Sequence, residues 1–143
     1  MRAVYITEFG RSDAVEVCDV PDPDAPTGDA VLVKVHAAGV NRADLLQAKG
    51  LYPPPAAYSP NMPGLEFAGE VASVGSTVSG WKTGDRVFGI LAAAGQAEFV
   101  VTHADLLASI PDHLSFVDAA AVPEAYITAH DAVFTQAGIM KGE

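Results

Sequence analysis

Alternating apolar and polar positions mark a series of short strands between residues 2 and 110. The strongest pattern is the segment 30–38, where β-branched residues recur at 31, 33 and 35 on one face. Shorter patterns, separated by Gly- and Pro-containing turns, predict strands at 2–7, 15–20, 67–74, 85–91, 96–102 and 106–110. Many short strands with such turns favour a mainly β fold, either a small barrel or a sandwich.

A few segments show the period of a helix instead. Residues 42–48 follow Asn41, which is a favourable N-cap residue. Ser115 and Asp118 have the spacing of a capping box, and Pro123 suits the first turn of a further helix. In that last helix an apolar face is expected from Tyr126, His130, Val133, Phe134 and Ala137. Because such a helix is unusual for a free-standing barrel, we expect it to be a connector to a segment beyond residue 143.

Composition limits the kinds of partner. Half of the residues are hydrophobic and the formal net charge is −10, which indicates one acidic globular domain. An acidic surface without a basic cluster repels phosphate backbones, so no nucleic-acid partner is expected. No apolar run has membrane-spanning length, and the first residues show no hydrophobic signal region. The single cysteine, Cys18, fits a reducing compartment, so a cytoplasmic location is expected.

The segment 40–69 is predicted to form the wall of a site. Its loop at 51–63 contains five prolines and two tyrosines, so it is long but stiff. Long ordered loops in compact domains are often functional. Glu66 follows within an apolar strand, and a carboxylate needs a partner if it is buried there.

Several common catalytic patterns are missing from the sequence. The four histidines, at 36, 103, 113 and 130, are not paired with one another or with a cysteine at metal-ligand spacing. His36 is predicted to be structural, and His103 and His113 to be exposed. No G-x-S-x-G or G-x-G-x-x-G motif occurs, so the chain carries no dinucleotide fingerprint of its own.

Two motifs resemble a known family. P-G-L-E-F-A-G-E-V-A-S-V-G at 63–75 and G-W-K-T-G-D-R-V-F-G at 80–89 resemble the N-terminal GroES-like domain of the medium-chain dehydrogenase/reductase superfamily. In the zinc alcohol dehydrogenases of that superfamily the first stretch reads P-G-H-E-x-x-G, and a Cys follows A-G-[IV] upstream. Here Leu65 replaces the His and Asn41 replaces the Cys, while Cys18 alone cannot furnish a structural zinc lobe. Both zinc sites are therefore expected to be absent.

The substituted pattern is similar to the zinc-free quinone oxidoreductases, the zeta-crystallin-like branch. The segments that carry this resemblance are A-A-G-V-N-R-A-D at 37–44, G-L-Y-P-P-P at 50–55 and A-A-V-P-E-A-Y-I-T-A at 120–129. It implies a GroES-like, partly open β-barrel at 1–122. It also implies a connector helix at 123–143 that leads to a Rossmann domain outside this chain, and a homodimeric parent protein.

The activity implied by the resemblance is reduction of a quinone or other conjugated carbonyl by NADPH, without zinc. Asn41 would face the nicotinamide and the substrate, and Thr128 would bond the nicotinamide carboxamide. Tyr52 would line the substrate pocket and donate to a developing oxyanion. Leu65 would fill the vacated metal position, and Glu66 would be structural or support the residues around it. Without the nucleotide-binding half, the 143 residues alone are expected to be inactive.

Simpler interpretations of these residues stay open. Asn41 could serve only as a helix cap, Tyr52 could only pack against the proline loop, and Thr128 could bond its own helix backbone. For the whole chain, the alternative is a stand-alone GroES-like binding or assembly module without turnover. A zinc alcohol dehydrogenase is a third option, and it predicts bound metal.

Overall fold

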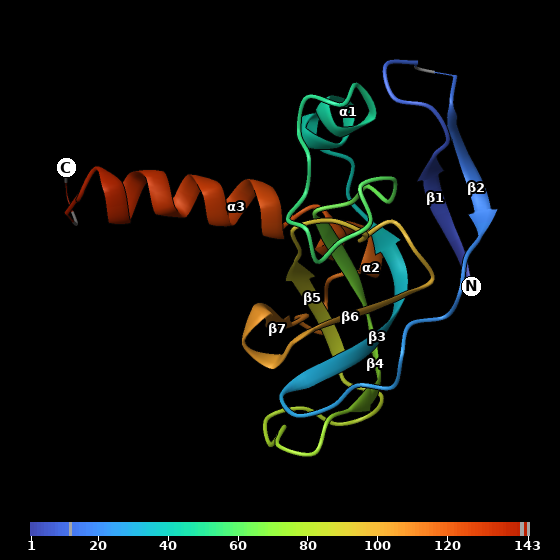
Figure 1. The fold of residues 1–143 in the computed structure, drawn as a ribbon. Helices are drawn as coiled ribbons and strands as arrows, with labels where there is room; N and C mark the ends of the chain where they lie inside the picture. Colours follow the sequence, from blue (N-terminus) through green and yellow to red (C-terminus); the bar gives the residue numbers. More distant parts are fainter. Residues whose placement is uncertain (12, 141, 143) are drawn as a thin grey trace.

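The computed structural model describes residues 1–11, 13–140 and 142, and its strands form two antiparallel sheets (Figure 1). The small sheet pairs β1 (Arg2–Ile6) with β2 (Val15–Asp19). The large sheet has the order β6-β3-β4-β5-β7. Its strands are β3 (Ala30–Ala38), β4 (Glu66–Val74), β5 (Arg86–Ile90), β6 (Phe99–His103) and β7 (Leu107–Ser109). Among the described residues β6 and β7 do not pair, so the predicted mainly β, GroES-like fold is confirmed as an open sheet and not a closed barrel.

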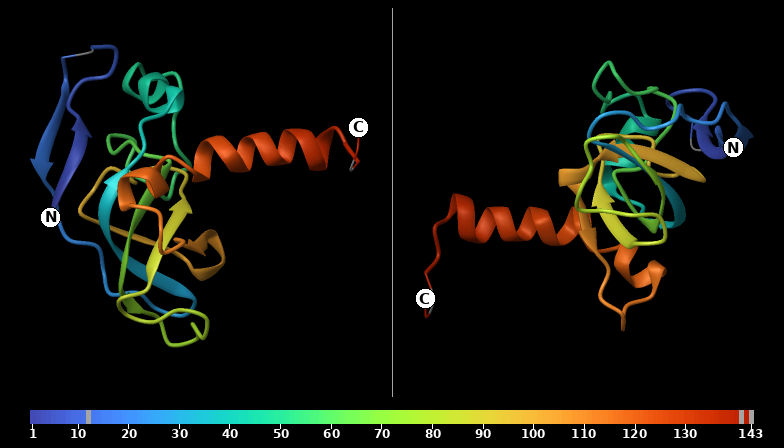
Figure 2. Two further views of the ribbon diagram at one scale, coloured as in Figure 1. Left: turned by 180° about the vertical axis from the view of Figure 1, so that it is seen from behind. Right: turned by 90° about the horizontal axis from the view of Figure 1, so that it is seen from below.

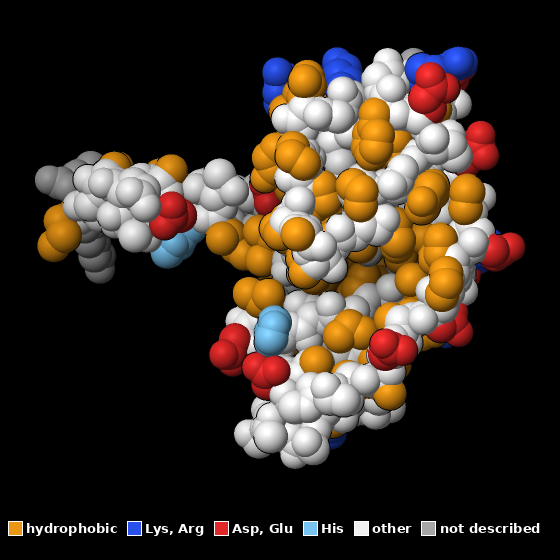
Figure 3. Space-filling view, viewed as in Figure 1, with side chains coloured by type: hydrophobic (Ala, Val, Ile, Leu, Met, Phe, Trp, Pro, Cys, Tyr) orange, Lys and Arg blue, Asp and Glu red, His pale blue; other side chains and the backbone are white. Residues whose placement is uncertain are grey.

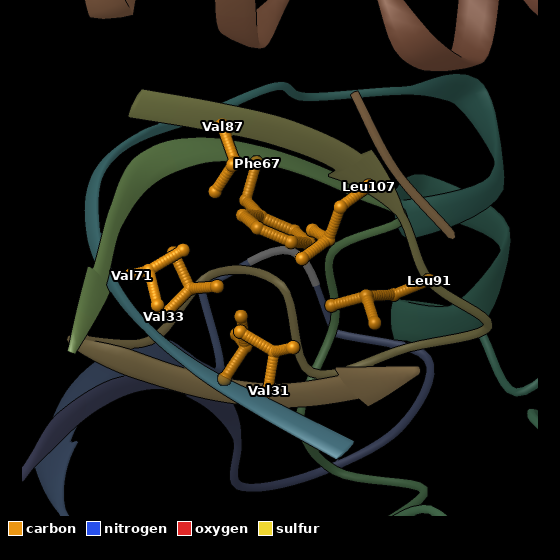
Figure 4. Packing of buried hydrophobic residues seen from close by; sticks show 8 residues of the cluster. Val31, Val33, Phe67, Val71, Val87, Leu91 and Leu107 are labelled. Atoms are coloured by element: carbon orange, nitrogen blue, oxygen red, sulfur yellow. The ribbon is translucent and has the colours of Figure 1, made fainter. Parts of the chain in front are cut away.

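The main core lies on the concave face of the large sheet (Figure 4). Side chains of a strand alternate between faces, so every second residue of β3 and β4 points inward. The buried cluster consists of Val31, Val33, Phe67, Val71, Val87, Leu91, Val100 and Leu107. Full burial of each such side chain stabilises the fold by roughly 1.5–3 kcal/mol.

A second, smaller cluster covers the opposite face of β4. Helix α2 (Phe116–Ala120) packs there, with Ala119 and Ala120 against Ala68. Ser115 caps this helix, because its Oγ accepts the Asp118 N–H at 3.1 Å as the capping-box spacing predicts. Since Glu66 lies two residues before Ala68 on the same strand, its side chain is directed to this second face. That position brings Glu66 to the place where helices α1 and α3 begin.

Helix α1 (Arg42–Ala48) matches its prediction, and α3 (Pro123–His130) starts at the predicted proline. Helix α3 continues through the π-helical segment η2 (Asp131–Gln136) and projects away from the sheets (Figures 1 and 2). The predicted helix is present, but residues 125–140 are all exposed. The expected apolar face therefore does not pack against either sheet. Within the described part of the chain, no helix combines the length and apolar character that crossing a membrane requires.

Apart from β3, every predicted strand differs from the structure by at least one residue at an end, and two of these differences have a clear structural reason. Strand β6 begins at Phe99 and not at residue 96, because Ala97 forms only an isolated bridge to Ala3 and the Gln96 side chain turns inward to bond Gly39. The predicted strand 106–110 is shorter because Ala104–Leu106 form a 3-10 turn, η1, before β7.

Candidate functional site

Glu66 is the centre of a group that we call the polar junction, consisting of the buried Asp44 and Glu66 and the half-buried Asn41 and Gln96. Only 3% of Glu66 is exposed. Its Oε1 accepts a hydrogen bond from Asn41 Nδ2 at 2.8 Å, and its Oε2 accepts one from the backbone N–H of Glu124 at 2.8 Å. The buried carboxylate thus has the partners that the sequence required, and it joins the starts of α1 and α3.

Gly39 gives the Glu66 side chain the space that it occupies. A Cβ atom on Gly39 would lie 2.1 Å from Glu66 Oε1, well inside contact distance. The Gly39 carbonyl also accepts a hydrogen bond from Gln96 Nε2 at 3.1 Å. The end of β3 therefore approaches the junction so closely that only glycine fits.

The start of α1 is fixed by an aspartate. Asp44 Oδ2 accepts the Asn41 N–H at 2.7 Å, and Asp44 Oδ1 accepts the Gly64 N–H at 2.9 Å. Asn41 occupies the N-cap position with an extended backbone, while its side-chain amide donates to Glu66. Asn41 is therefore both the residue that starts α1 and a member of the junction, so it is more than a cap.

The proline loop is anchored to the body by polar side chains. Gln47, which is 2% exposed, donates from Nε2 to the carbonyl oxygens of Pro60 at 2.9 Å and Met62 at 3.2 Å. Asn61 Nδ2 donates to the Ile6 carbonyl at 2.6 Å. These bonds hold both the helix and the first strand against the loop, in agreement with a stiff segment.

A cavity of about 590 Å³ lies beside this loop. Its lining residues are Tyr52, Pro53, Pro54, Pro55, Leu65, Ile90, Leu91, Ala92 and Glu124. Figure 3 shows that apolar side chains cover much of the face beside the projecting helix, with charged side chains mostly at its margins. Its volume falls within the range of small-molecule sites, and its lining side chains are mostly apolar apart from Tyr52 and Glu124.

The structure brings some of the predicted site residues together. Tyr52, which is 44% exposed, and the buried Leu65 share the cavity wall. Asn41 is connected to that wall through Glu66, whose second oxygen holds Glu124. Thr128 lies outside the cavity lining, exposed on α3 one turn after Glu124 and on the same side of the helix.

Sequence reasoning missed Glu124 as a site residue. The pKa of its carboxyl is raised, first by burial and then by the negative charges of Glu66 and Asp44. In the sequence, Glu124 is simply an acid in the first turn of a helix, where it complements the helix dipole. Only the fold reveals that this acid faces a cavity and has two carboxylates as neighbours.

The donor set of the junction does not suit zinc. Leu65 has no lone pair, the Asn41 amide nitrogen donates to Glu66, and Cys18 lies in β2 of the other sheet. Within residues 1–11, 13–140 and 142, no group of three or more His, Cys, Asp or Glu is arranged to hold a metal ion.

The histidines lie outside the cavity lining. His36 stacks on Phe116 with 4.4 Å between ring centroids, and its Nε2 is 3.4 Å from Glu70 Oε2. The exposed His103 lies with Nδ1 3.1 Å from Asp29 Oδ2. These contacts agree with the structural role predicted for His36 and the exposed position predicted for His103.

Comparisons with known proteins place this geometry in a family. The model of the alcohol dehydrogenase GroES-like domain matches residues 27–112. The chain is 39% identical over 145 residues to the quinone oxidoreductase of Mus musculus, covering 100% of this chain and 43% of that protein. It is 43% identical over 135 residues to erythronolide synthase EryA2 of Saccharopolyspora erythraea, covering 94% of this chain and 4% of that protein.

A solved structure supports the same relationship. A mycobacterial protein complexed with NADPH superposes with a TM-score of 0.86 at 30% identity, covering 100% of this chain and 44% of that one. The chain therefore spans less than half the length of these relatives. The chain belongs to the alcohol dehydrogenase GroES-like domain family and is a relative of the quinone oxidoreductases of the medium-chain dehydrogenase/reductase superfamily.

Proposed function

We propose that this chain is the substrate-side domain of an NADPH-dependent oxidoreductase that reduces quinones or enones without zinc. The observation that carries the proposal is the cavity in which Tyr52 and Leu65 share a wall, next to a junction without soft metal ligands. The relationship to quinone oxidoreductases supports the class of reaction. Residues 123–143 would then be the connector to a nucleotide-binding domain, and the whole protein a cytoplasmic homodimer.

The polar residues at the base of α3 fit the head of a nicotinamide cofactor. Asn41 and Thr128 carry groups that can bond a carboxamide. Asn41 is linked to the first turn of α3 through Glu66, and Thr128 lies one turn after Glu124 on the same helix. When bound, the cofactor would supply a hydride to the acceptor. The remainder of the cofactor would lie against a domain outside the 143 residues.

The side chains of the cavity have separate roles in this proposal. The Tyr52 hydroxyl donates a hydrogen bond to the acceptor oxygen as negative charge develops on it. Leu65 and the three loop prolines that line the cavity exclude water from the acceptor. Quinones and enones accept a hydride without the Lewis acid that simple ketones and aldehydes require, which suits a wall with Leu65 in it.

The proposal is tested with the full-length protein. We expect NADPH oxidation with benzoquinone or an unsaturated ketone, no oxidation of simple alcohols, and no zinc in elemental analysis. The isolated 143 residues should be inactive. Absence of turnover with every quinone and enone would favour the binding module instead, and stoichiometric zinc would favour an alcohol dehydrogenase.

Tyr52→Phe tests the assigned hydrogen-bond donor. Loss of one donor to an oxyanion typically lowers kcat about 10²–10³-fold, so a large decrease in kcat is expected. Tyr58→Phe is the matched control, because Tyr58 lies in the same loop but does not line this cavity. An unchanged kcat in Tyr52→Phe would remove this role from the mechanism.

A further inference from the structure

Three carboxylates from distant parts of the chain lie near one another, and one of them lines the cavity. Asp44 comes from α1, Glu66 from β4 and Glu124 from the first turn of α3. Asp44 and Glu66 are buried, and each of their side-chain oxygens accepts at least one N–H hydrogen bond. Glu124 differs because its bond to Glu66 uses its backbone N–H, so that bond does not engage its carboxyl, and Glu124 is the one of the three that lines the cavity.

The surroundings of Glu124 are acidic and raise the pKa of its carboxyl. Glu66 on β4 and Asp44 on α1 are the charged groups that act on it, and both are negative. Tyr52 on the proline loop is the titratable group that shares its cavity wall, and none of the described residues of that lining is a Lys, Arg or His. Burial, together with these two charges, raises the pKa of the Glu124 carboxyl.

We propose that Glu124 is the proton donor of the cavity and delivers a proton to the acceptor oxygen. This inference rests on the proposed function. The acceptor gains two electrons and one hydrogen as hydride from a reduced nicotinamide, which leaves negative charge on its oxygen. The O–H bond of Glu124 then breaks as an O–H bond forms on the acceptor, and a hydroquinone or an enol results.

The position of Glu124 also allows the proton to be replaced. Glu124 is partly exposed, so its carboxylate can take a new proton from solvent after each turnover. Asp44 and Glu66 are more deeply buried and accept N–H bonds, so they act as charged neighbours of Glu124. Tyr52 on the same wall orients the acceptor oxygen by its hydrogen bond.

The first experiment compares pH profiles of kcat for the full-length wild type, Glu124→Gln and Glu16→Gln. Since the protonated form of Glu124 is active, wild-type kcat should fall as pH rises through the pKa of Glu124. Glu124→Gln should lower kcat at least about tenfold at the optimum and remove this fall; general acids contribute about 10²–10⁴-fold, and Tyr52 remains in place. Glu16→Gln, an exposed change on β2, should match the wild type.

Two outcomes separate this inference from the proposed function. If the wild type reduces quinones and Glu124→Gln keeps the same rate and pH profile, the proton-donor role is wrong and the proposed function stands. If the wild type reduces no quinone or enone, the proposed function is wrong and the inference fails with it. Glu124→Asp keeps an acid, so kcat should be lower than in the wild type but should still fall as pH rises. A purely structural role of Glu124 does not predict this pH dependence.

A second readout does not depend on turnover. Carbon-13 NMR of the glutamate carboxyl carbons in the full-length protein, without cofactor, should show one signal that Glu124→Gln removes. That signal should titrate above the ordinary glutamate pKa of about 4.3. Titration at or below that value would overturn the assignment of Glu124 as the proton donor. Glu124→Gln retains the backbone bond to Glu66, so a folded variant is expected, and its circular dichroism spectrum checks this.

Discussion

The polar junction and helix α3 meet at Glu124, but different interactions stabilise them. In the junction, Asp44 and Glu66 are buried and bonded to groups far away in the sequence. Along α3 and η2, residues 125–140 are exposed, so the helix depends mainly on hydrogen bonds along its own backbone. The comparison shows that the geometry of the site is determined by long-range contacts, while the projecting helix is determined locally.

Gly39→Ala should disrupt the polar junction and cause the largest loss of stability among these variants. The new methyl group would overlap the Glu66 carboxylate, which cannot move without losing its bonds to Asn41 and Glu124. We expect the free energy of unfolding to fall by about 3 kcal/mol in urea titrations. Gly80→Ala is the matched control, because no atom lies within 4 Å of its added methyl group. Equal stability of the two variants would contradict the close approach.

Glu66→Ala should have the next largest effect. It leaves the Asn41 amide and the Glu124 N–H without their buried acceptor, and each unpaired donor costs about 1–3 kcal/mol. We expect a loss of about 2 kcal/mol, because water partly replaces the carboxylate. Glu16→Ala on the exposed strand β2 should change the unfolding free energy by less than about 0.5 kcal/mol. A change in Glu66→Ala as small as that in Glu16→Ala would mean that the junction adds nothing to stability.

Glu124→Gln should give a smaller, pH-dependent gain in stability. The folded-state pKa of Glu124 lies above its unfolded value, so the stability linked to its protonation is present below the unfolded pKa and is lost as pH rises through the folded pKa. The variant should therefore be more stable than wild type at neutral pH, by less than about 1 kcal/mol because water screens a partly exposed carboxylate. Thermal unfolding at neutral and acidic pH measures this difference. A gain that is larger at acidic pH would have the wrong sign.

Ala129→Gly should have the smallest effect on the whole domain. Glycine weakens a helix interior by about 1 kcal/mol, but Ala129 is exposed on α3 and contacts neither core cluster. We expect faster hydrogen exchange in α3 with an unchanged midpoint for unfolding of the sheets. A lower midpoint would show that α3 and the sheets unfold together.

The difference between local and long-range interactions also explains which features could be predicted from the sequence. Strand β3 and helix α1 have the predicted bounds, because their alternation and capping signals lie within the segments themselves. The predicted start of β6 was wrong because the Gln96 side chain bonds Gly39 across the fold. A local sequence pattern cannot indicate such a long-range contact. The spacing of apolar residues correctly predicted the last helix. Helical spacing alone, however, does not show whether another part of the protein packs against the apolar face.

The candidate site was predictable to a similar extent. Tyr52 and Leu65 were identified through family motifs and do share a cavity, and Glu66 was expected to need a partner if it was buried. Glu124 was missed because its neighbours Asp44 and Glu66 lie far away in the sequence. The N-x-x-D spacing of Asn41 and Asp44 is a capping signal that could have identified Asp44.

The two hydrogen bonds of Glu66 have a mechanical consequence. One oxygen holds the residue that starts α1, and the other holds the first turn of α3 at 2.8 Å. Glu66 thus links the start of α1 to the first turn of α3 through one side chain. A change in the position of α3 that kept both hydrogen bonds would therefore also move Asn41, and with it the start of α1.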